Sequence, residues 1–380
     1  MKLLRLAVLT IFVIATIVAS APAADTIKIG AILAETGPAS FLGAPEAKTL
    51  AMLTEEINAK GGIAGKKIQL IIKDSGASPE KAISFAKQLI EEEKVFAIIG
   101  PSTSGETMAI KNLAEESKTI LLSCAAAEVI VNPLAKHVFK VAPKDSYAVE
   151  KIYHQMKKMG IAKIGVLSSN TGFGKAGKEQ LEKYAAAHDI TIALSEVYDK
   201  SATDLTAEVT KMKGAGVQAI VNWSIEPAQA IVLKNARQIG LTVPIFQSHG
   251  FANIQYARTA GAAAEGVIFP ASRIVVADLL SDKNPQKSVL ADYKKKYESK
   301  FKEDVSTFGG HGYDALMILT RAIQTAGDDR EKVRTAIENL KGFVGTAGVF
   351  NLSPTDHNGL DIDAFAMLTV KEGKFALLEK

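Results

Sequence analysis

Hydroxyl side chains cluster in one short segment, Gly-Pro-Ser-Thr-Ser-Gly at residues 100–105. The segment follows a short apolar run typical of a buried strand and precedes an amphipathic stretch typical of a helix. Ser102, Thr103 and Ser104 therefore fall at the start of a predicted helix, where unpaired backbone N–H groups attract anions. A plain helix cap needs only one hydroxyl, so three in succession favour contact with an anionic group of a ligand.

A glycine pattern at residues 172–177, Gly-Phe-Gly-Lys-Ala-Gly, has the G-x-G-x-x-G spacing of a dinucleotide site. We reject that interpretation, because the dinucleotide motif turns tightly off its strand and residues 168–171 intervene here. Phe173 then lies between two glycines at the end of a predicted strand, where its ring can meet a ligand.

Two further residue types occur where predicted strands end. Trp223, the only tryptophan, closes the predicted strand 219–223 and is followed by Ser-Ile-Glu-Pro, which includes Ile225. His249 follows the predicted strand 244–247. A core tryptophan and a surface histidine are the plain alternatives, but the carboxyl ends of strands favour a ligand cleft.

Catalytic patterns are absent from the sequence. There is no G-x-S-x-G, no H-E-x-x-H and no paired-cysteine metal motif, and the six histidines are scattered. Cys124 is the only cysteine, so an intrachain disulfide is impossible and a small buried side chain is the simplest expectation. We therefore expect no enzyme, no cofactor and no metal site.

The elements that must position these residues alternate between strand-like and helix-like patterns. Predicted strands lie at residues 27–33, 68–73, 96–100, 120–123, 163–169, 190–197, 219–223, 244–247 and 267–270. Short apolar strands separated by amphipathic helices predict an α/β fold with parallel sheets.

The alternation restarts near Pro143 and gives way to a mainly helical block after Pro270, before two last strand-like runs at 348–352 and 364–370. This order predicts two Rossmann-like lobes that exchange segments by several crossings. One lobe would hold residues 25–143 and 271–345, and the other 144–270 and 346–380. The cleft between them would lie at the carboxyl ends of the strands.

The N-terminus is typical of an exported protein. Lys2 and Arg5 precede an apolar run at 6–18 and small residues at 19–24, which predicts a signal peptide over residues 1–24. No cysteine lies near the cleavage site, so we expect a soluble periplasmic protein without a lipid anchor. The formal charge of +4 would fall by two on cleavage, and no basic cluster indicates a nucleic-acid partner.

Seven segments together resemble the periplasmic leucine/isoleucine/valine-binding proteins, the type I solute receptors of ABC importers. They are IGAILAETGP at 29–38, EINAKGGI at 56–63, IGPSTSG at 99–105, GFG at 172–174, ARQIGL at 236–241, AEG at 264–266 and GYDA at 312–315. The resemblance covers essentially the whole mature chain. It implies two lobes joined by three crossover segments, closure around a small-molecule ligand, no cofactor, no chemistry and delivery to ABC permease subunits in the inner membrane. We also expect a monomer.

The resemblance also implies ligand-binding positions. The serine that holds the ligand carboxylate corresponds to Ser104, beside Ser102 and Thr103, and a backbone contact corresponds to Ala125. The ligand-facing stretch of the second lobe corresponds to Trp223 to Ile225. Three positions depart from the family pattern: its threonine is Ala127, its usual tyrosine is Phe173 and its acidic residue is His249.

These departures remove the groups that would hold the ammonium of an amino acid. A buried ammonium without an acceptor or counter-charge costs several kcal/mol. Phe173 and Trp223 offer apolar ring faces instead. We therefore expect a hydrophobic carboxylate, aromatic or branched, without an α-amino group. A branched-chain amino acid is the alternative ligand, and a soluble sensor for a separate receptor is the alternative function.

Overall fold

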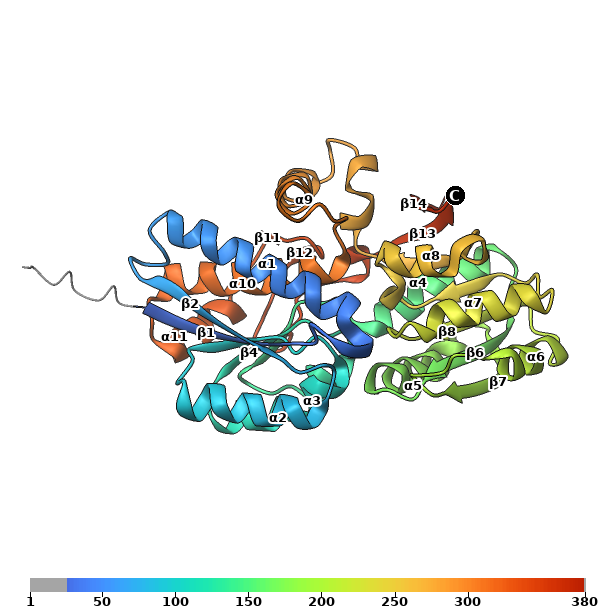
Figure 1. Cartoon of the computed structure of the whole chain (residues 1–380), viewed down its shortest axis with the longest axis horizontal. Coiled ribbons are helices and arrows are strands. Elements are labelled where there is room, and N and C mark those ends of the chain that lie inside the picture. The colour runs from blue at the N-terminus through green and yellow to red at the C-terminus, as the bar shows by residue number, and fades with distance from the viewer. Residues whose placement is uncertain (1–25, 379–380) are drawn as a thin grey trace, which may run out of the picture.

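The computed structural model describes residues 26–378, which form two lobes side by side along the long axis of the molecule (Figure 1). The predicted signal peptide lies outside these residues. The first lobe is built on a parallel five-stranded sheet in the order β2-β1-β3-β4-β5. Its strands are β1 (Thr26–Leu33), β2 (Lys67–Asp74), β3 (Ala97–Ile99), β4 (Ile120–Ser123) and β5 (Val138–Lys140).

Helices cover both faces of this sheet. On one face lie α1 (Ser40–Ala59), α10 (Thr307–Ala326) and α11 (Arg330–Glu338), and α9 (Lys287–Phe301) packs outside them, with Tyr293 against Thr49 of α1 and Tyr313 of α10. The other packs on α2 (Pro79–Lys87), its π-helical continuation η2 (Gln88–Glu92) and α3 (Ser104–Glu116). Because both faces are covered, the inner strands β1, β3 and β4 are mainly apolar, as the sequence predicted, whereas the edge strand β2 mixes apolar with polar residues.

The second lobe is built on a seven-stranded sheet in the order β14-β13-β10-β9-β8-β6-β7. Its strands are β6 (Lys163–Ser169), β7 (Thr191–Tyr198), β8 (Ala219–Trp223), β9 (Ile245–Gln247), β10 (Ile268–Ala271), β13 (Ala366–Lys371) and β14 (Lys374–Leu377). Its helices are α4 (Asp145–Lys158), α5 (Gly172–Ala185), α6 (Thr206–Gly214), α7 (Ala228–Gln238) and α8 (Ile254–Ala260). Short 3-10 turns complete the connections of both lobes: η1 (Gly37–Ala39), η3 (Glu128–Ile130), η4 (Ala186–His188), η5 (His249–Phe251), η6 (Gly261–Ala264), η7 (Arg273–Leu279) and η8 (Ile362–Ala364).

This second sheet is mixed, which differs from the predicted parallel sheets. β13 runs antiparallel to β10, with Ile268 opposite Thr369, and β14 runs antiparallel to β13. The reason lies in the path of the chain. β10 ends at the junction between the lobes and β13 begins there, so the two strands must run in opposite directions.

Three crossover segments join the lobes, between β5 and α4, between β10 and α9, and between η8 and β13. The third differs from the predicted boundary at 345/346, which falls inside the turn between β11 (Phe343–Val344) and β12 (Val349–Phe350). Phe350 and Ala364 pack in the core of the first lobe, whereas Phe365 and Leu368 pack in that of the second. We therefore propose that the last crossing lies at residues 364–365.

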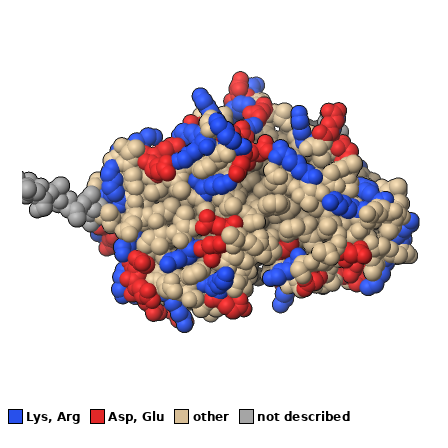
Figure 2. Space-filling view, in the orientation of Figure 1, with Lys and Arg blue, Asp and Glu red and all other residues tan. Residues whose placement is uncertain are grey.

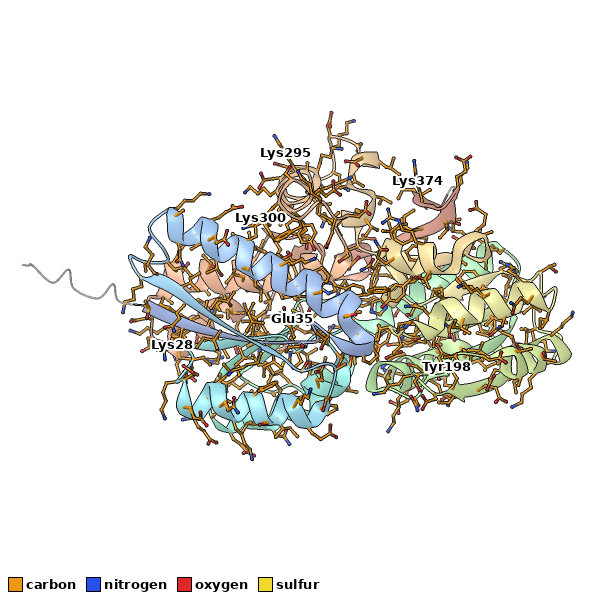
Figure 3. The ribbon with its side chains drawn as sticks, viewed as in Figure 1. Lys28, Glu35, Tyr198, Lys295, Lys300 and Lys374 are labelled. Carbon is orange, nitrogen blue, oxygen red and sulfur yellow. The ribbon has the colours of Figure 1, made fainter. Side chains whose placement is uncertain are left out.

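The carboxyl ends of the first-lobe strands face the second lobe. Lys28 near the start of β1 lies at the far end of the molecule, whereas Glu35, just after β1, lies near the junction (Figure 3). Charged side chains of both signs are interspersed over the face shown in Figure 2. Between residues 26 and 378, no helix is long and apolar enough to cross a membrane.

Candidate functional site

The two lobes touch each other, so the structure is closed. A Cβ atom added to Gly172 of the second lobe would lie 2.8 Å from the Cα of Gly105 in the first. The rings of Phe41 and Tyr256 meet edge to face across the junction at 5.0 Å, and Asn253 Nδ2 donates to the Phe41 carbonyl oxygen at 3.0 Å. The space between the lobes is therefore enclosed on several sides.

An inner cavity of about 20 Å³, enough for one water, lies between the lobes. Its walls are Leu42, Ser102, Ser104, Cys124, Ala125, Ala126, Phe173, Ile225, His249, Gly250, Phe308 and His311. Residues from both lobes contribute. Five of the predicted binding residues thus meet here as side chains: Ser102, Ser104, Phe173, Ile225 and His249. Ala125 joins them through the segment after β4.

An outer cleft of about 340 Å³ adjoins this cavity, and Phe173 and Ile225 border both spaces. The cleft is lined by Pro38, Ala39, Ala77, Pro79, Thr103, Gly105, Asn170, Thr171, Gly172, Phe173, Lys200, Ile225 and Glu226. Its volume is that of a small-molecule site, which typically measures about 300–1,000 Å³. A ligand could therefore place one small polar group in the inner cavity while the rest of the molecule occupied the outer cleft.

Ser104 is the first residue of α3 and carries a hydroxyl that can serve a ligand. Its Oγ accepts from the N–H of Ala127 at 3.3 Å, and its proton has no acceptor among the described residues. The N–H of Ala126 lines the same cavity and makes no hydrogen bond within residues 26–378, whereas the N–H of Ala125 donates to Ser123 Oγ at 3.1 Å. The free backbone donor in this wall is thus that of Ala126, one residue beyond the predicted position.

The other two hydroxyls of the turn are already engaged. Ser102 Oγ accepts from the N–H of Ala34 at 3.0 Å and donates to the carboxyl of Glu46. Burial raises the pKa of Glu46 well above its ordinary value, although the bond from Ser102 opposes the shift. Thr103 caps α3 by accepting from the N–H of Glu106 at 3.4 Å, and it faces the outer cleft. These hydroxyls shape the turn, and Ser104 is the one left to donate.

The second-lobe wall consists mainly of rings. Phe173 lies in the first turn of α5, which Thr171 caps by accepting from the N–H of Gly174 at 3.2 Å. Phe173 and His249 meet edge to face, with their ring centres 5.3 Å apart. This wall offers apolar area and one imidazole but no carboxylate.

Trp223 lies one layer behind this wall, although the sequence predicted that it would border the cleft. It is fully buried, 5.7 Å from the Phe173 ring and 5.6 Å from the His249 ring. Its indole fills the space above Gly177, where an added Cβ would lie 2.0 Å from the indole nitrogen. Trp223 therefore positions the two rings that do face the cavity. Ala127 is also set back, with only its N–H directed at Ser104.

A second histidine, His311 of α10, reaches the inner cavity from the first lobe. Its exposed fraction is 3%, against 6% for His249. Neither ring nitrogen of His249 makes a hydrogen bond to a described residue, and the ring of His311 lies near only the Cys124 backbone, which opposes the fall in its pKa. Burial lowers the pKa of both imidazoles to about 3, and the positive charge of Lys140 contributes to both shifts. Both rings are thus neutral in the closed lobes, each with one N–H to donate.

Sequence reasoning missed His311, Phe308 and the outer-cleft residue Glu226. His311 directly precedes the motif at 312–315, but no local pattern distinguishes it from a core position on an apolar helix. Glu226 follows Ile225; its Oε2 accepts from Ser224 Oγ at 2.7 Å and from the Ile225 N–H at 3.2 Å.

The cavity brings Cys124 and His311 together but does not form a thiol dyad. Neither ring nitrogen of His311 hydrogen-bonds the sulfur, and burial raises the pKa of the Cys124 thiol well above its ordinary value. Nucleophilic thiols need the opposite shift. Within residues 26–378, no group of three histidine, cysteine or acidic side chains could hold a metal ion. The arrangement suits retention of a small anion with an apolar body.

The family match and the curated relatives both indicate a periplasmic binding protein. The family described as "Periplasmic binding protein" matches residues 26–374. A curated relative, the leucine-, isoleucine-, valine-, threonine- and alanine-binding protein of Pseudomonas aeruginosa, is 26% identical over 89% of this chain and 87% of its own.

Solved structures share the whole architecture. An extracellular ligand-binding receptor from Rhodopseudomonas palustris HaA2 superposes with a TM-score of 0.88 at 28% identity, covering 93% of this chain and 99% of that one. The branched-chain amino acid transporter substrate binding protein LivJ of Streptococcus pneumoniae, in complex with isoleucine, gives 0.82 at 26% identity, covering 92% and 98%. The predicted resemblance is therefore confirmed: this chain belongs to the periplasmic binding protein family and has its type I fold.

Proposed function

We propose that this protein captures a small hydrophobic carboxylate, aromatic or branched and lacking an α-amino group, between its lobes and delivers it to an ABC permease in the inner membrane. It acts by binding and release, without catalysis, as a monomer in the periplasm. The observation that carries the proposal is the inner cavity, where a free hydroxyl and a free backbone N–H face a wall of rings.

The first-lobe wall supports binding of the carboxylate. Ser104 Oγ accepts from Ala127 but donates to none of the described residues, the Ala126 N–H likewise has no acceptor among them, and both groups lie at the cavity beside the N-terminus of α3. The partial positive charge of a helix N-terminus favours an anion there. A carboxylate oxygen would satisfy these donors at once.

The second-lobe wall supports an apolar body without an ammonium. Phe173 and Ile225 separate the inner cavity from the outer cleft, so a ring or branched chain attached to the carboxylate would lie against them. The acid that other family members use for an ammonium is replaced by His249, which is neutral when buried and already lies near Lys140.

The relatives support a small carboxylate-bearing ligand. The Pseudomonas aeruginosa relative is named for five amino acids, and the Streptococcus pneumoniae structure contains isoleucine. Each of those ligands carries a carboxylate and most carry a branched apolar side chain.

A branched-chain amino acid is the second candidate, because Glu226 lines the outer cleft. Its side chain is 3% exposed and sits one residue from Ile225. A carboxylate at that position could pair with an ammonium that entered from the cleft side. The resemblance to the family placed the acidic position at His249 and implied no acid next to Ile225.

Calorimetric titration of the mature protein with benzoate, 4-methyl-2-oxopentanoate and leucine separates the two candidates. We expect the first two to bind and leucine to bind at least about tenfold more weakly, a difference of about 1.4 kcal/mol. Micromolar leucine binding without binding of either acid would overturn the proposed ligand class.

Two variants sharpen the result. His249→Glu supplies an acid next to the rings and should shift the preference towards leucine. Glu226→Gln removes the alternative ammonium partner and should leave the binding of benzoate unchanged. Loss of leucine binding in Glu226→Gln, from a wild-type protein that binds leucine tightly, would establish the second candidate instead.

A further inference from the structure

Two imidazoles line the inner cavity, one from each lobe, and neither forms an ion pair with a described residue. His249 belongs to η5 after β9 in the second lobe, and His311 belongs to α10 in the first. Both line the cavity and both are more than nine-tenths buried. Neither ring nitrogen of His249 has a hydrogen-bond partner among the described residues, and the ring of His311 lies near only the backbone of Cys124, which opposes the fall in its pKa without a well-formed hydrogen bond. Buried polar groups are normally paired, so these nitrogens point to a ligand.

We propose that His249 and His311 form a pair that grips the ligand's anionic group from both lobes and takes up one proton when the lobes close on it. This inference rests on the proposed function, because it assigns the anion of that ligand to the pair together with Ser104. It adds His311 as a binding residue and makes capture dependent on pH.

The surroundings of the pair are nearly free of negative charge. His249 packs on the rings of Phe173, Trp223 and Phe365, and His311 packs on Phe308 and beside the backbone of Cys124. The titratable group of β5 that faces both is Lys140, whose Nζ donates to the Ala142 carbonyl oxygen at 2.6 Å and whose own pKa is lowered by burial to about 7. A ligand anion would therefore be the nearest negative charge to both rings.

The acids nearby are either neutralised or engaged elsewhere. Glu46 of α1 is hydrogen-bonded to Ser102, and burial raises its pKa well above the ordinary value. Asp314 of α10 accepts from the Thr346 and Ala347 backbone, and burial raises its pKa to about 7. Asp145 of α4 accepts from the N–H of Glu128 and offsets the charge of Lys140. None of them hydrogen-bonds to either imidazole.

The sign of the pH dependence follows from the two states. An imidazole that faces water between open lobes has a pKa near about 6.5. Closure without an anion lowers the pKa, because burial and Lys140 disfavour the charged ring. Closure around an anion raises it, because the opposite charge favours the imidazolium. The complex thus holds a proton that the open protein lacks above about pH 6.5, and affinity rises as pH falls towards that value.

Calorimetric titration in buffers of different ionisation enthalpy counts the proton directly. With benzoate, 4-methyl-2-oxopentanoate and leucine as probes at pH 7.5, we expect uptake approaching about one proton for each molecule bound, with affinity falling up to about tenfold per pH unit between pH 7 and 9. The variants His249→Gln and His311→Gln keep a hydrogen-bonding side chain but cannot titrate. Each should reduce the uptake, and the double variant should abolish it.

His188→Gln is the matched control, because His188 lies in η4 of the second lobe, half-buried against Tyr153 and His154 and outside both the cavity and the cleft. It should retain the full uptake and its pH dependence. Thermal unfolding shows whether each variant is folded, and His311→Asn replaces His311→Gln if the longer amide disrupts α10.

The possible outcomes are distinct. Binding of any probe without proton uptake overturns the histidine pair but leaves the proposed function intact. Uptake that persists in the double variant assigns the proton to Lys140 and also overturns the pair. Leucine binding alone, with uptake that the double variant loses, supports the pair and overturns the ligand class. Failure of all three probes to bind overturns both.

Discussion

The two walls of the inner cavity are built in opposite ways. The first-lobe wall is a turn of small residues held by hydrogen bonds: Ser102 between Ala34 and Glu46, Thr103 on Glu106, and Ser104 on Ala127. The second-lobe wall is held by packing of the Phe173, His249 and Trp223 rings, with no hydrogen bond to the indole or imidazole nitrogens from the described residues.

The difference indicates a division of tasks. Hydrogen-bonded backbone and hydroxyl groups have fixed directions, so the first wall is suited to a carboxylate that every ligand of this class would share. Ring packing depends on shape and area, so the second wall is suited to discriminating between ligands by the size and shape of their apolar part. Substitutions in the two walls should therefore have different consequences for stability and for affinity.

The largest expected effect concerns stability and comes from Trp223→Ala. Removing a fully buried indole should lower the free energy of unfolding by about 3–5 kcal/mol, measured by urea denaturation. Benzoate affinity should fall as well, because Phe173 and His249 lose the ring behind them. Trp223→Phe, which keeps a ring, should lose much less stability. A near-wild-type midpoint for the alanine variant would show that this wall is not held by packing.

The next effect concerns affinity and comes from Ser104→Ala. Loss of its hydroxyl should weaken benzoate binding by about 1–3 kcal/mol, since a charged partner in a buried site would lose a hydrogen bond. Stability should change little, because Ser104 contributes only the 3.3 Å bond from Ala127. Thr103→Ala is the contrasting change: it removes the cap of α3 and should cost about 1 kcal/mol of stability. Equal benzoate affinity for wild type and Ser104→Ala in calorimetry would remove Ser104 from the site.

The smallest expected effect concerns the contact between the lobes at Gly105 and Gly172, beside the outer cleft. A methyl group at Gly172 would lie 2.8 Å from the Cα of Gly105, so Gly172→Ala should oppose closure and weaken benzoate binding by about 1 kcal/mol. Gly105→Ala is the matched control, because its methyl would lie 3.9 Å from the nearest atom, the Gly172 nitrogen. If both variants bound benzoate as tightly as wild type, closure at this contact would not contribute to capture.

Local patterns predicted much of this molecule. Buried strands read as short apolar runs, and the predicted strand at 27–33 corresponds to β1 (Thr26–Leu33). The hydroxyl turn at 102–104 does begin a helix, because caps depend on residues within one turn. β13 (Ala366–Lys371) overlaps the predicted strand-like run at 364–370. The strands β5 and β14 were not predicted, because no α-helix separates either of them from the strand before it and the strand–helix alternation that marks the other strands is missing there.

The sequence by itself determined the two-lobed α/β fold, the turn that carries Ser104 and the absence of an acid at His249. Each of these depends on residue type, periodicity or neighbours close in the chain. Only the tertiary structure decided which hydroxyls are already engaged, that Trp223 stands behind Phe173, and that His311 reaches the same cavity as His249. These facts depend on lobe closure, which brings together residues far apart in the chain, and no local pattern encodes that geometry.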